Sequence, residues 1–220
     1  MKLIIDTANV KEIKRLCEIL NVWGVTTNPT IISKENKPFE EVISDIDKVL
    51  EKDQVLFVQV VSTDYESIVK EGRYIATLRK NIVAKIPVTA DGLKAIKTLH
   101  KEGIKILATA INNATQGFVA ALNGAEYLAP YVNRMTNYTD GVEETIILQQ
   151  MLDAHDLDTE IIAASLKNTG QVKELIRNGI ESVTLPVDIA DLMYLNPATD
   201  TAVEAFTNSW YKAYNKKTLI

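Results

Sequence analysis

The sequence repeats one pattern along its length: a short apolar run is followed by a segment whose apolar residues recur every three or four positions. The first part is typical of a buried strand and the second of an amphipathic helix. Because the units follow one another without a Pro-, Gly- or Ser-rich linker, we expect one α/β domain over residues 1–220, and eight units favour a closed (β/α)8 TIM barrel. The eight strands are predicted at residues 3–6, 24–28, 56–61, 82–87, 105–111, 127–132, 160–165 and 182–187.

An open, doubly wound parallel sheet is the structural alternative. Such sheets commonly bind nucleotides through G-x-G-x-x-G or G-x-x-x-x-G-K-[ST] after a strand, and neither motif occurs in the sequence. The closed barrel is therefore favoured.

The helical segments come with recognisable start signals. Asn9 with Glu12, and Thr63 with Glu66, have the spacing of capping boxes. Helices are expected at about residues 9–20, from Pro38 to 50, and at 63–80, 90–102, 113–122, 142–155 and 170–177.

An extra helix is expected at about residues 199–214, after the last strand. It carries an apolar stripe of Val203, Phe206, Trp210 and Tyr214, spaced three and four apart. Such a stripe needs a partner surface. The residues alone favour docking on the chain's own barrel over docking on another subunit.

Charge and cysteine content narrow the possible functions. Acidic residues outnumber basic ones by 29 to 24, and the net charge of -5 indicates neither a nucleic-acid nor an anionic membrane partner. The opening MKLIID is too short an apolar run for a signal peptide, and no membrane span is expected. The single cysteine, Cys17, permits no internal disulfide, which suits the cytoplasm. His100 and His155 stand far apart, so neither a metal centre nor a Ser-His-Asp triad is indicated.

One charged residue stands inside a predicted buried strand. In NIVAKIPVT, residues 81–89, Lys85 has apolar neighbours on both alternating faces, as in a parallel sheet covered by helices. Burial of an ammonium group favours the neutral amine, a nucleophile that forms Schiff bases with ketones and aldehydes. The alternative is that Lys85 ends its strand and reaches solvent past Pro87.

Polar residues occur near the carboxyl ends of seven predicted strands. Because active sites of parallel barrels lie at this end, we expect these side chains to surround the lysine. Each also has an ordinary interpretation, such as helix capping, strand propensity or core packing. Together, a tyrosine, a threonine and an amide are able to hold a water that moves protons beside the amine. In strand order the residues are Asp6, Asn28, Gln59, Lys85, Thr109, Tyr131 and Ser165.

A second group predicts an anion site. Arg134 follows the sixth strand, and Ser165 with Lys167 ends the seventh. Late strands of such barrels commonly bind phosphate, and these side chains suit it. A surface ion pair is the alternative for Arg134.

Several segments together resemble one enzyme family throughout the chain. The motifs are DTAN at 6–9, GVTTNPTII at 24–32, FVQV at 57–60, VAKIPVTADGLKAIK at 83–97, APYVNR at 129–134, AASLK at 163–167 and ESVTLP at 181–186. They resemble fructose-6-phosphate aldolase and the small transaldolases. The resemblance implies a class I aldolase barrel without a cofactor, in which Lys85 forms the Schiff base.

Three positions favour the aldolase branch of this family. Transaldolases usually carry Glu, Phe and Gly where this chain has Gln59, Tyr131 and Asn133. A tyrosine hydroxyl near the bound dihydroxyacetone unit helps to protonate and release it, whereas phenylalanine leaves the enamine waiting for an acceptor aldehyde. The expected reaction is reversible cleavage of fructose 6-phosphate into dihydroxyacetone and glyceraldehyde 3-phosphate.

Two other functions are weighed against this one. A transaldolase would pass the three-carbon unit to erythrose 4-phosphate through the same lysine, and a noncatalytic barrel would only bind sugar phosphates. The resemblance also implies that the terminal helix reaches a neighbouring subunit in five-membered rings that stack into a decamer.

The sequence departs from the family pattern in one loop. Met135-Thr136 stands where the family usually has Ile-Asp, beside the expected phosphate site.

Overall fold

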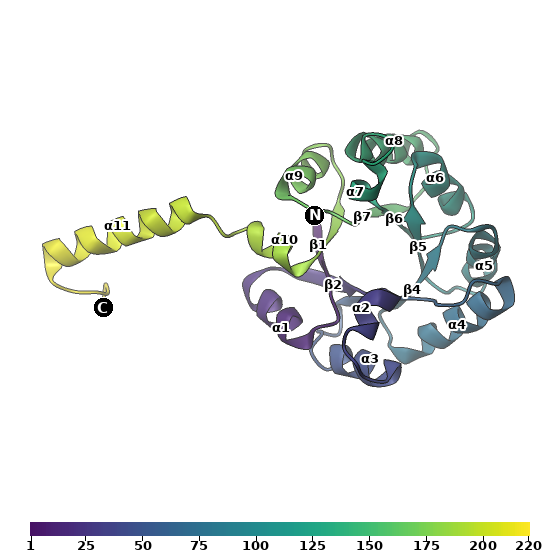
Figure 1. Cartoon of the computed structure of the whole chain (residues 1–220), viewed down its shortest axis with the longest axis horizontal. Helices are drawn as coiled ribbons and strands as arrows, with labels where there is room; N and C mark the ends of the chain where they lie inside the picture. Colours follow the sequence, from purple (N-terminus) through teal and green to yellow (C-terminus); the bar gives the residue numbers. More distant parts are fainter.

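The computed structural model describes residues 1–220 and contains a closed barrel of eight parallel strands, which confirms the predicted TIM barrel (Figure 1). Each strand pairs with its neighbours in sequence order, and β8 closes the barrel against β1. The strands are β1 (Lys2–Asp6), β2 (Val22–Thr26), β3 (Val55–Gln59), β4 (Ile82–Pro87), β5 (Ile106–Ile111), β6 (Tyr127–Pro130), β7 (Glu160–Ala163) and β8 (Ser182–Leu185).

Helices surround the barrel, except for the last one, which extends away from it (Figure 1). None of them combines the length and the apolar character that crossing a membrane requires. They are α1 (Val10–Ile19), α2 (Pro29–Ser33), α3 (Phe39–Asp47), α4 (Tyr65–Leu78), α5 (Ala90–Lys101), α6 (Ala114–Leu122), α7 (Val132–Met135), α8 (Gly141–Ala154), α9 (Thr169–Arg177), α10 (Val187–Leu192) and α11 (Pro197–Tyr214).

Several strands end earlier than predicted. β2 stops at Thr26 because the Asn28 side chain caps α2, accepting from the Ile31 amide at 3.0 Å, and Pro29 takes the first helical position. β3, β6, β7 and β8 also stop two residues short of the predicted ends, and α7 and α10 start where strands were expected to continue. Helices as short as α2, α7 and α10 contain too few residues for a helical period to show in the sequence.

The two predicted capping boxes are correct only in part. Asn9 caps α1 by accepting from two amides of the first turn. Glu12 does not complete the box, because its carboxylate accepts from Arg15 Nε at 2.9 Å. At α4 the cap is Asp64 and not Thr63, as expected where a carboxylate is available at the positive end of a helix.

The hydrophobic core has two layers. The larger layer packs the outward faces of the strands against the surrounding helices. The smaller layer fills the barrel interior and leaves the carboxyl ends of the strands for polar side chains. Its buried members are Ile4, Phe57, Val83, Leu107, Ala129, Ile162 and Ala164.

Aromatic and charged side chains close the amino end of the barrel. Trp23, Phe57 and Tyr127 lie with ring centroids 5.5 to 6.1 Å apart. The Glu160 carboxylate accepts from the Lys2 ammonium and the Ser182 hydroxyl. This end of the barrel is therefore filled.

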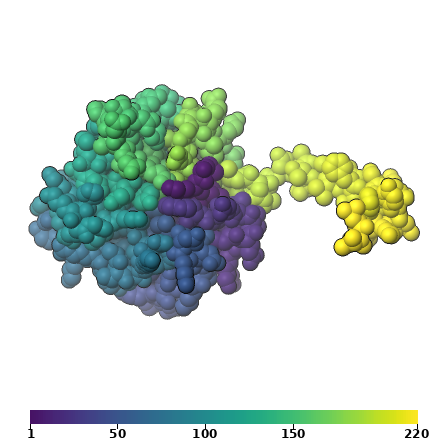
Figure 2. All heavy atoms as spheres, turned by 180° about the vertical axis from the view of Figure 1, so that it is seen from behind, coloured from purple at the N-terminus to yellow at the C-terminus, as the bar shows by residue number.

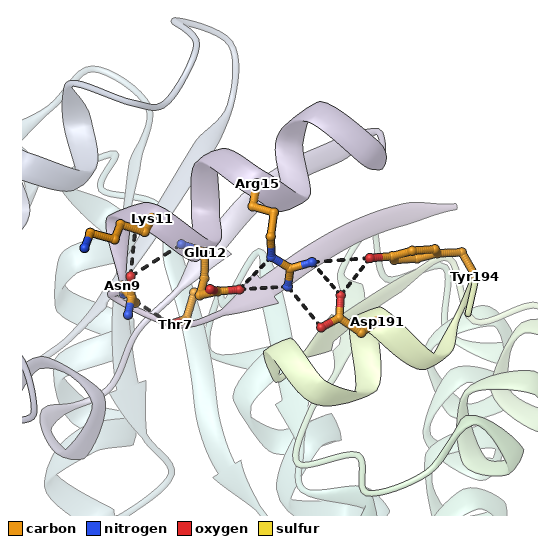
Figure 3. A network of polar contacts seen from close by, with 7 residues as sticks. All are labelled: Thr7, Asn9, Lys11, Glu12, Arg15, Asp191 and Tyr194. Atoms are coloured by element: carbon orange, nitrogen blue, oxygen red, sulfur yellow. Dashed lines mark hydrogen bonds and ion pairs between the residues drawn. The ribbon is translucent and has the colours of Figure 1, made fainter. Parts of the chain in front are cut away.

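An ion pair joins α1 to α10 (Figure 3). The Arg15 guanidinium donates to both carboxylate oxygens of Asp191, at 2.8 and 3.0 Å, and the Tyr194 hydroxyl donates to the same carboxylate at 2.9 Å. Hydrogen bonding from Arg15 holds the pKa of Asp191 below its ordinary value. The pair fixes the segment from which the terminal helix departs.

The terminal helix α11 does not dock on its own barrel, so the interpretation that the residues alone favoured is wrong. Figures 1 and 2 show it standing clear of the barrel, and none of its residues is buried. Val203 is 56% exposed and Phe206 is 73% exposed. Val203 and Phe206 of the apolar stripe therefore have no covering surface within the chain, whereas Trp210 packs against Tyr214 of the same helix.

Candidate active site

Lys85 lies in the barrel interior and not in solvent. Only 3% of its surface is exposed, and its Nζ donates to the backbone carbonyl of Thr27 at 3.2 Å. The predicted burial is confirmed, and the alternative in which the side chain reaches water past Pro87 is wrong. The position follows from the strand period, because Val83, two residues earlier on β4, belongs to the interior layer.

Gln59 stands beside Lys85. The two residues are register partners on β3 and β4, so their side chains point to the same side of the sheet. The Gln59 Oε1 atom is buried and has no hydrogen-bond partner within the protein. A buried amide oxygen left without a partner costs about 1–3 kcal/mol, so this atom fits a polar ligand or water bound beside the lysine.

Thr109 and Tyr131 form a hydroxyl pair at the ends of the next two strands. The Thr109 hydroxyl is buried and donates to the Tyr131 hydroxyl at 3.2 Å. Ala110, directly after Thr109, adopts the left-handed conformation with φ 57, and the pairing of β5 with β6 shifts register there. This bulge changes the direction of the strand at the point where the two hydroxyls meet.

Asp6 takes part in a buried chain of hydroxyl groups. Its Oδ1 accepts from the Thr26 hydroxyl at 2.7 Å, and the Thr26 and Thr184 hydroxyl oxygens lie 2.5 Å apart. These atoms connect β1, β2 and β8 inside the barrel. Neither threonine was predicted as a site residue. Threonine is common in strands, so its occurrence there does not by itself indicate a functional role.

Asn28 has the ordinary role that was considered for it. Its Oδ1 accepts the Ile31 amide as the cap of α2. The side-chain amide group remains able to donate, so the cap and a contact with a substrate oxygen are compatible.

The three residues of the predicted anion site come from two adjacent loops. Arg134, on α7, is exposed, and its guanidinium carbon lies 4.5 Å from the centre of the Tyr131 ring. Ser165 follows β7 with φ 60, and its carbonyl accepts from the Asn133 amide at 3.3 Å. Lys167 is exposed two residues further on. The structure thus brings Ser165 to the start of α7, next to Arg134.

Met135 and Thr136, where the sequence departs from the family pattern, are both held in place by local contacts. Met135 is buried at the end of α7, and the Thr136 hydroxyl donates to the Asn133 carbonyl at 2.6 Å. The loop that carries Arg134 is therefore held by packing on one side and by a hydrogen bond on the other.

All the predicted site residues lie at one end of the barrel, within a few residues of the carboxyl ends of seven successive strands. No group of three or more His, Cys, Asp or Glu side chains is placed to hold a metal ion. The arrangement presents a buried amine, an amide oxygen without a hydrogen-bond partner, a pair of hydroxyl groups, a carboxylate and nearby cations. These groups suit carbonyl chemistry on a polar, anionic substrate.

Solved structures share this fold. Two structures of a double mutant of flavocytochrome b2 match, one with pyruvate bound and one with sulfite bound, at TM-scores of 0.62 and 0.61. Sequence identity is 13% and 14%, and the matches cover 93% and 84% of this chain. The chain spans 61% and 56% of the length of those proteins. At this identity the likeness concerns the barrel fold alone.

The sequence also matches a family model. The match covers residues 3–218 and describes transaldolase/fructose-6-phosphate aldolase. The chain therefore belongs to the transaldolase/fructose-6-phosphate aldolase family, as its motifs indicated.

Proposed function

We propose that the protein is a class I aldolase that reversibly cleaves fructose 6-phosphate into dihydroxyacetone and glyceraldehyde 3-phosphate. Family membership supports the reaction class. The hydroxyl pair of Tyr131 and Thr109, on the strands that follow that of Lys85, is the observation that favours the aldolase over a transaldolase. A tyrosine hydroxyl at this place supplies a proton that a phenylalanine does not.

The reaction uses the iminium ion that Lys85 forms with the substrate as an electron sink. The neutral amine attacks the C2 ketone of open-chain fructose 6-phosphate, and the carbinolamine loses water to give an iminium ion. The C3–C4 bond breaks, its electron pair forms an enamine, the C4 hydroxyl gives up its proton, and glyceraldehyde 3-phosphate leaves. Protonation at C3 and addition of one water then release dihydroxyacetone and restore the amine, so the water lost in the first stage is replaced in the last.

The polar groups around the lysine handle protons and orientation. Tyr131 and Thr109, with Gln59, hold a water that carries protons between the lysine, the substrate oxygens and C3. The unpaired Gln59 Oε1 supports this role, because such a water would supply the missing hydrogen bond. Asp6 and Asn28 position the substrate hydroxyls and the lysine.

The phosphate group lies at the rim of the barrel in this proposal. Arg134, Ser165 and Lys167 bind it, with two cationic side chains and one hydroxyl group from loops that a backbone hydrogen bond connects. The guanidinium carbon of Arg134 lies 4.5 Å from the centre of the Tyr131 ring, which supports a phosphate contact next to the proposed proton donor.

A second copy of this chain covers α11 in the proposed assembly. The helix stands away from its own barrel (Figure 2). Val203 and Phe206 are exposed on it, and a stripe of this kind is normally covered by another protein surface. The family resemblance favours a ring in which each helix lies on the next subunit.

The substrate assignment is tested by mixing the purified protein with fructose 6-phosphate and following glyceraldehyde 3-phosphate. Release without any acceptor aldehyde supports the aldolase. Release only after addition of erythrose 4-phosphate, with formation of sedoheptulose 7-phosphate, contradicts it and identifies a transaldolase. Binding of fructose 6-phosphate without either reaction identifies a noncatalytic barrel.

A further inference from the structure

We propose that Thr184 is a positioning residue that holds the Asp6 carboxylate through the hydroxyl group of Thr26. The proposal rests on the proposed function, in which Asp6 acts beside Lys85. Thr184 lies on β8 and Thr26 on β2, and β1, which carries Asp6, runs between them. Thr184 is the register partner of Ile4, which belongs to the interior layer. Thr26 is the register partner of Asp6, two residues after Ile4 on the same strand. Both threonine side chains therefore point into the barrel.

The direction of the hydrogen bonds follows from counting protons. An ionised carboxylate only accepts, and a threonine hydroxyl has one proton to give. The Thr26 hydroxyl donates its proton to Asp6 Oδ1 at 2.7 Å. It has no second proton to give, so in the contact of 2.5 Å between the two threonine hydroxyl oxygens the donor is Thr184. The chain therefore runs from Thr184 to Thr26 to Asp6.

Burial protects this chain of hydrogen bonds from water. Thr26 is fully buried and Thr184 is 2% exposed, so bulk water does not compete for either hydroxyl. Hydrogen bonds in series strengthen one another in a low-dielectric interior. Without the Thr184 hydroxyl, the Thr26 oxygen keeps an unused acceptor site, and the rotation of the Thr26 hydroxyl toward Asp6 is no longer fixed.

Thr26 also lies next to the residue that contacts the lysine. Its neighbour Thr27 accepts from Lys85 Nζ through the backbone carbonyl. A change in the Thr26 side chain therefore affects both the carboxylate and the segment that the amine contacts. Because misplacement by about 1 Å can lower a rate about 100-fold, loss of this chain is expected to reduce turnover.

The test uses kcat and KM for cleavage in Thr184→Val, which keeps the side-chain shape and removes the hydroxyl. Thr184→Ser restores the hydroxyl. Thr145→Val is the matched control, since Thr145 is also fully buried and its hydroxyl bonds only the Gly141 carbonyl on α8. We expect Thr184→Val to lower kcat by about 10- to 100-fold with little change in KM, and Thr184→Ser and Thr145→Val to stay within about threefold of the parent.

A double-mutant cycle separates positioning from simple structural damage. In an Asp6→Ala background there is no carboxylate to position, so Thr184→Val is expected to cause no further loss. An equal loss in both backgrounds overturns the proposal, as does an unchanged kcat in Thr184→Val or an equal loss in Thr145→Val. If the parent protein cleaves no fructose 6-phosphate, the proposed function fails, and the rate of borohydride trapping with dihydroxyacetone becomes the readout of the same cycle.

Discussion

The Nζ atom of Lys85 donates to the backbone carbonyl of Thr27 at 3.2 Å, across the barrel from β4 to the segment after β2. The Thr27 peptide is itself anchored, because its amide and its hydroxyl both donate to the Phe57 carbonyl, at 3.0 and 2.9 Å. Lys85 forms no ion pair, and its Nζ atom hydrogen-bonds only to this neutral carbonyl. The barrel thus fixes the position of the amine without a charged partner.

Replacing Tyr131 by phenylalanine is expected to shift the protein from aldolase toward transaldolase behaviour. Without the hydroxyl that Thr109 contacts, protonation of the enamine slows, and the intermediate lives long enough to meet an acceptor. Cleavage without acceptor should fall by about 10²-fold or more, whereas transfer to erythrose 4-phosphate persists. Tyr127→Phe, at the closed end of the same strand, is the control. Equal loss of both reactions in Tyr131→Phe would contradict the assigned role.

Replacing Arg134 by glutamine is expected to weaken binding of phosphorylated substrate. A hydrogen bond between charged groups contributes about 1.5–3 kcal/mol, so KM for fructose 6-phosphate should rise by about 10- to 100-fold. The reverse reaction of dihydroxyacetone with unphosphorylated glyceraldehyde should be little affected. Arg177→Gln provides the control, because Arg177 pairs with Glu174 on α9. Equal effects of Arg134→Gln on both substrates would place the phosphate elsewhere.

The ion pair between Arg15 and Asp191 predicts a pH-dependent stability. The folded-state pKa of Asp191 is lowered from 3.8 by the hydrogen bond from Arg15. Its stabilising contribution is therefore present above the unfolded-state value and is lost as pH falls through the lower folded-state value. Asp191→Asn should reduce the free energy of unfolding by about 1 kcal/mol at neutral pH, as for a partly exposed pair.

Urea unfolding of both proteins as a function of pH measures this contribution. The difference between parent and Asp191→Asn should shrink below about pH 3.8 as the parent carboxylate becomes protonated. Glu174→Gln removes an exposed pair of the same type on α9 and serves as the control. A difference that stays constant with pH would show that charge plays no part in the effect.

A charge on the apolar stripe of α11 is expected to break the proposed assembly. Phe206→Glu places a carboxylate where the helix would contact another subunit, whereas Asn208→Glu places the same charge about half a turn away. Sedimentation should show dissociation of the Phe206→Glu variant only. Circular dichroism should show that the barrel of this variant is intact. A parent protein that sediments as a monomer would rule out the assembly.

The strand period made much of the site predictable from sequence. Once Lys85 is placed inward on its strand, the polar residues late in the other strands fall at the same end of the barrel, and Gln59 and Thr109 lie there as expected. The contact of Tyr131 with Thr109 joins two strands whose order follows from the fold. Residue type and position within a strand were sufficient for these placements.

Other features depend on geometry that residue types do not encode. The contact between Thr26 and Thr184 crosses β1 and depends on the stagger of the closed barrel, and threonine alone indicates only a strand. The short helices after β2, β6 and β8 leave no helical period in the sequence. The orientation of α11 could not be predicted from its stripe, because an amphipathic helix indicates that a partner surface exists and not which chain supplies it.

Trapping of the Schiff base tests the central role of Lys85 most directly. The protein is incubated with dihydroxyacetone and borohydride, digested, and analysed by mass spectrometry, with Lys85→Met and Lys105→Met measured in parallel. The proposed mechanism predicts a reduced three-carbon adduct on the peptide that contains Lys85, retained in Lys105→Met. In Lys85→Met the adduct and turnover should both be absent. The variant should stay folded, because methionine is an apolar side chain of similar length that needs no hydrogen-bond partner in the buried interior. An adduct at another lysine, or substantial cleavage by folded Lys85→Met, would contradict the mechanism.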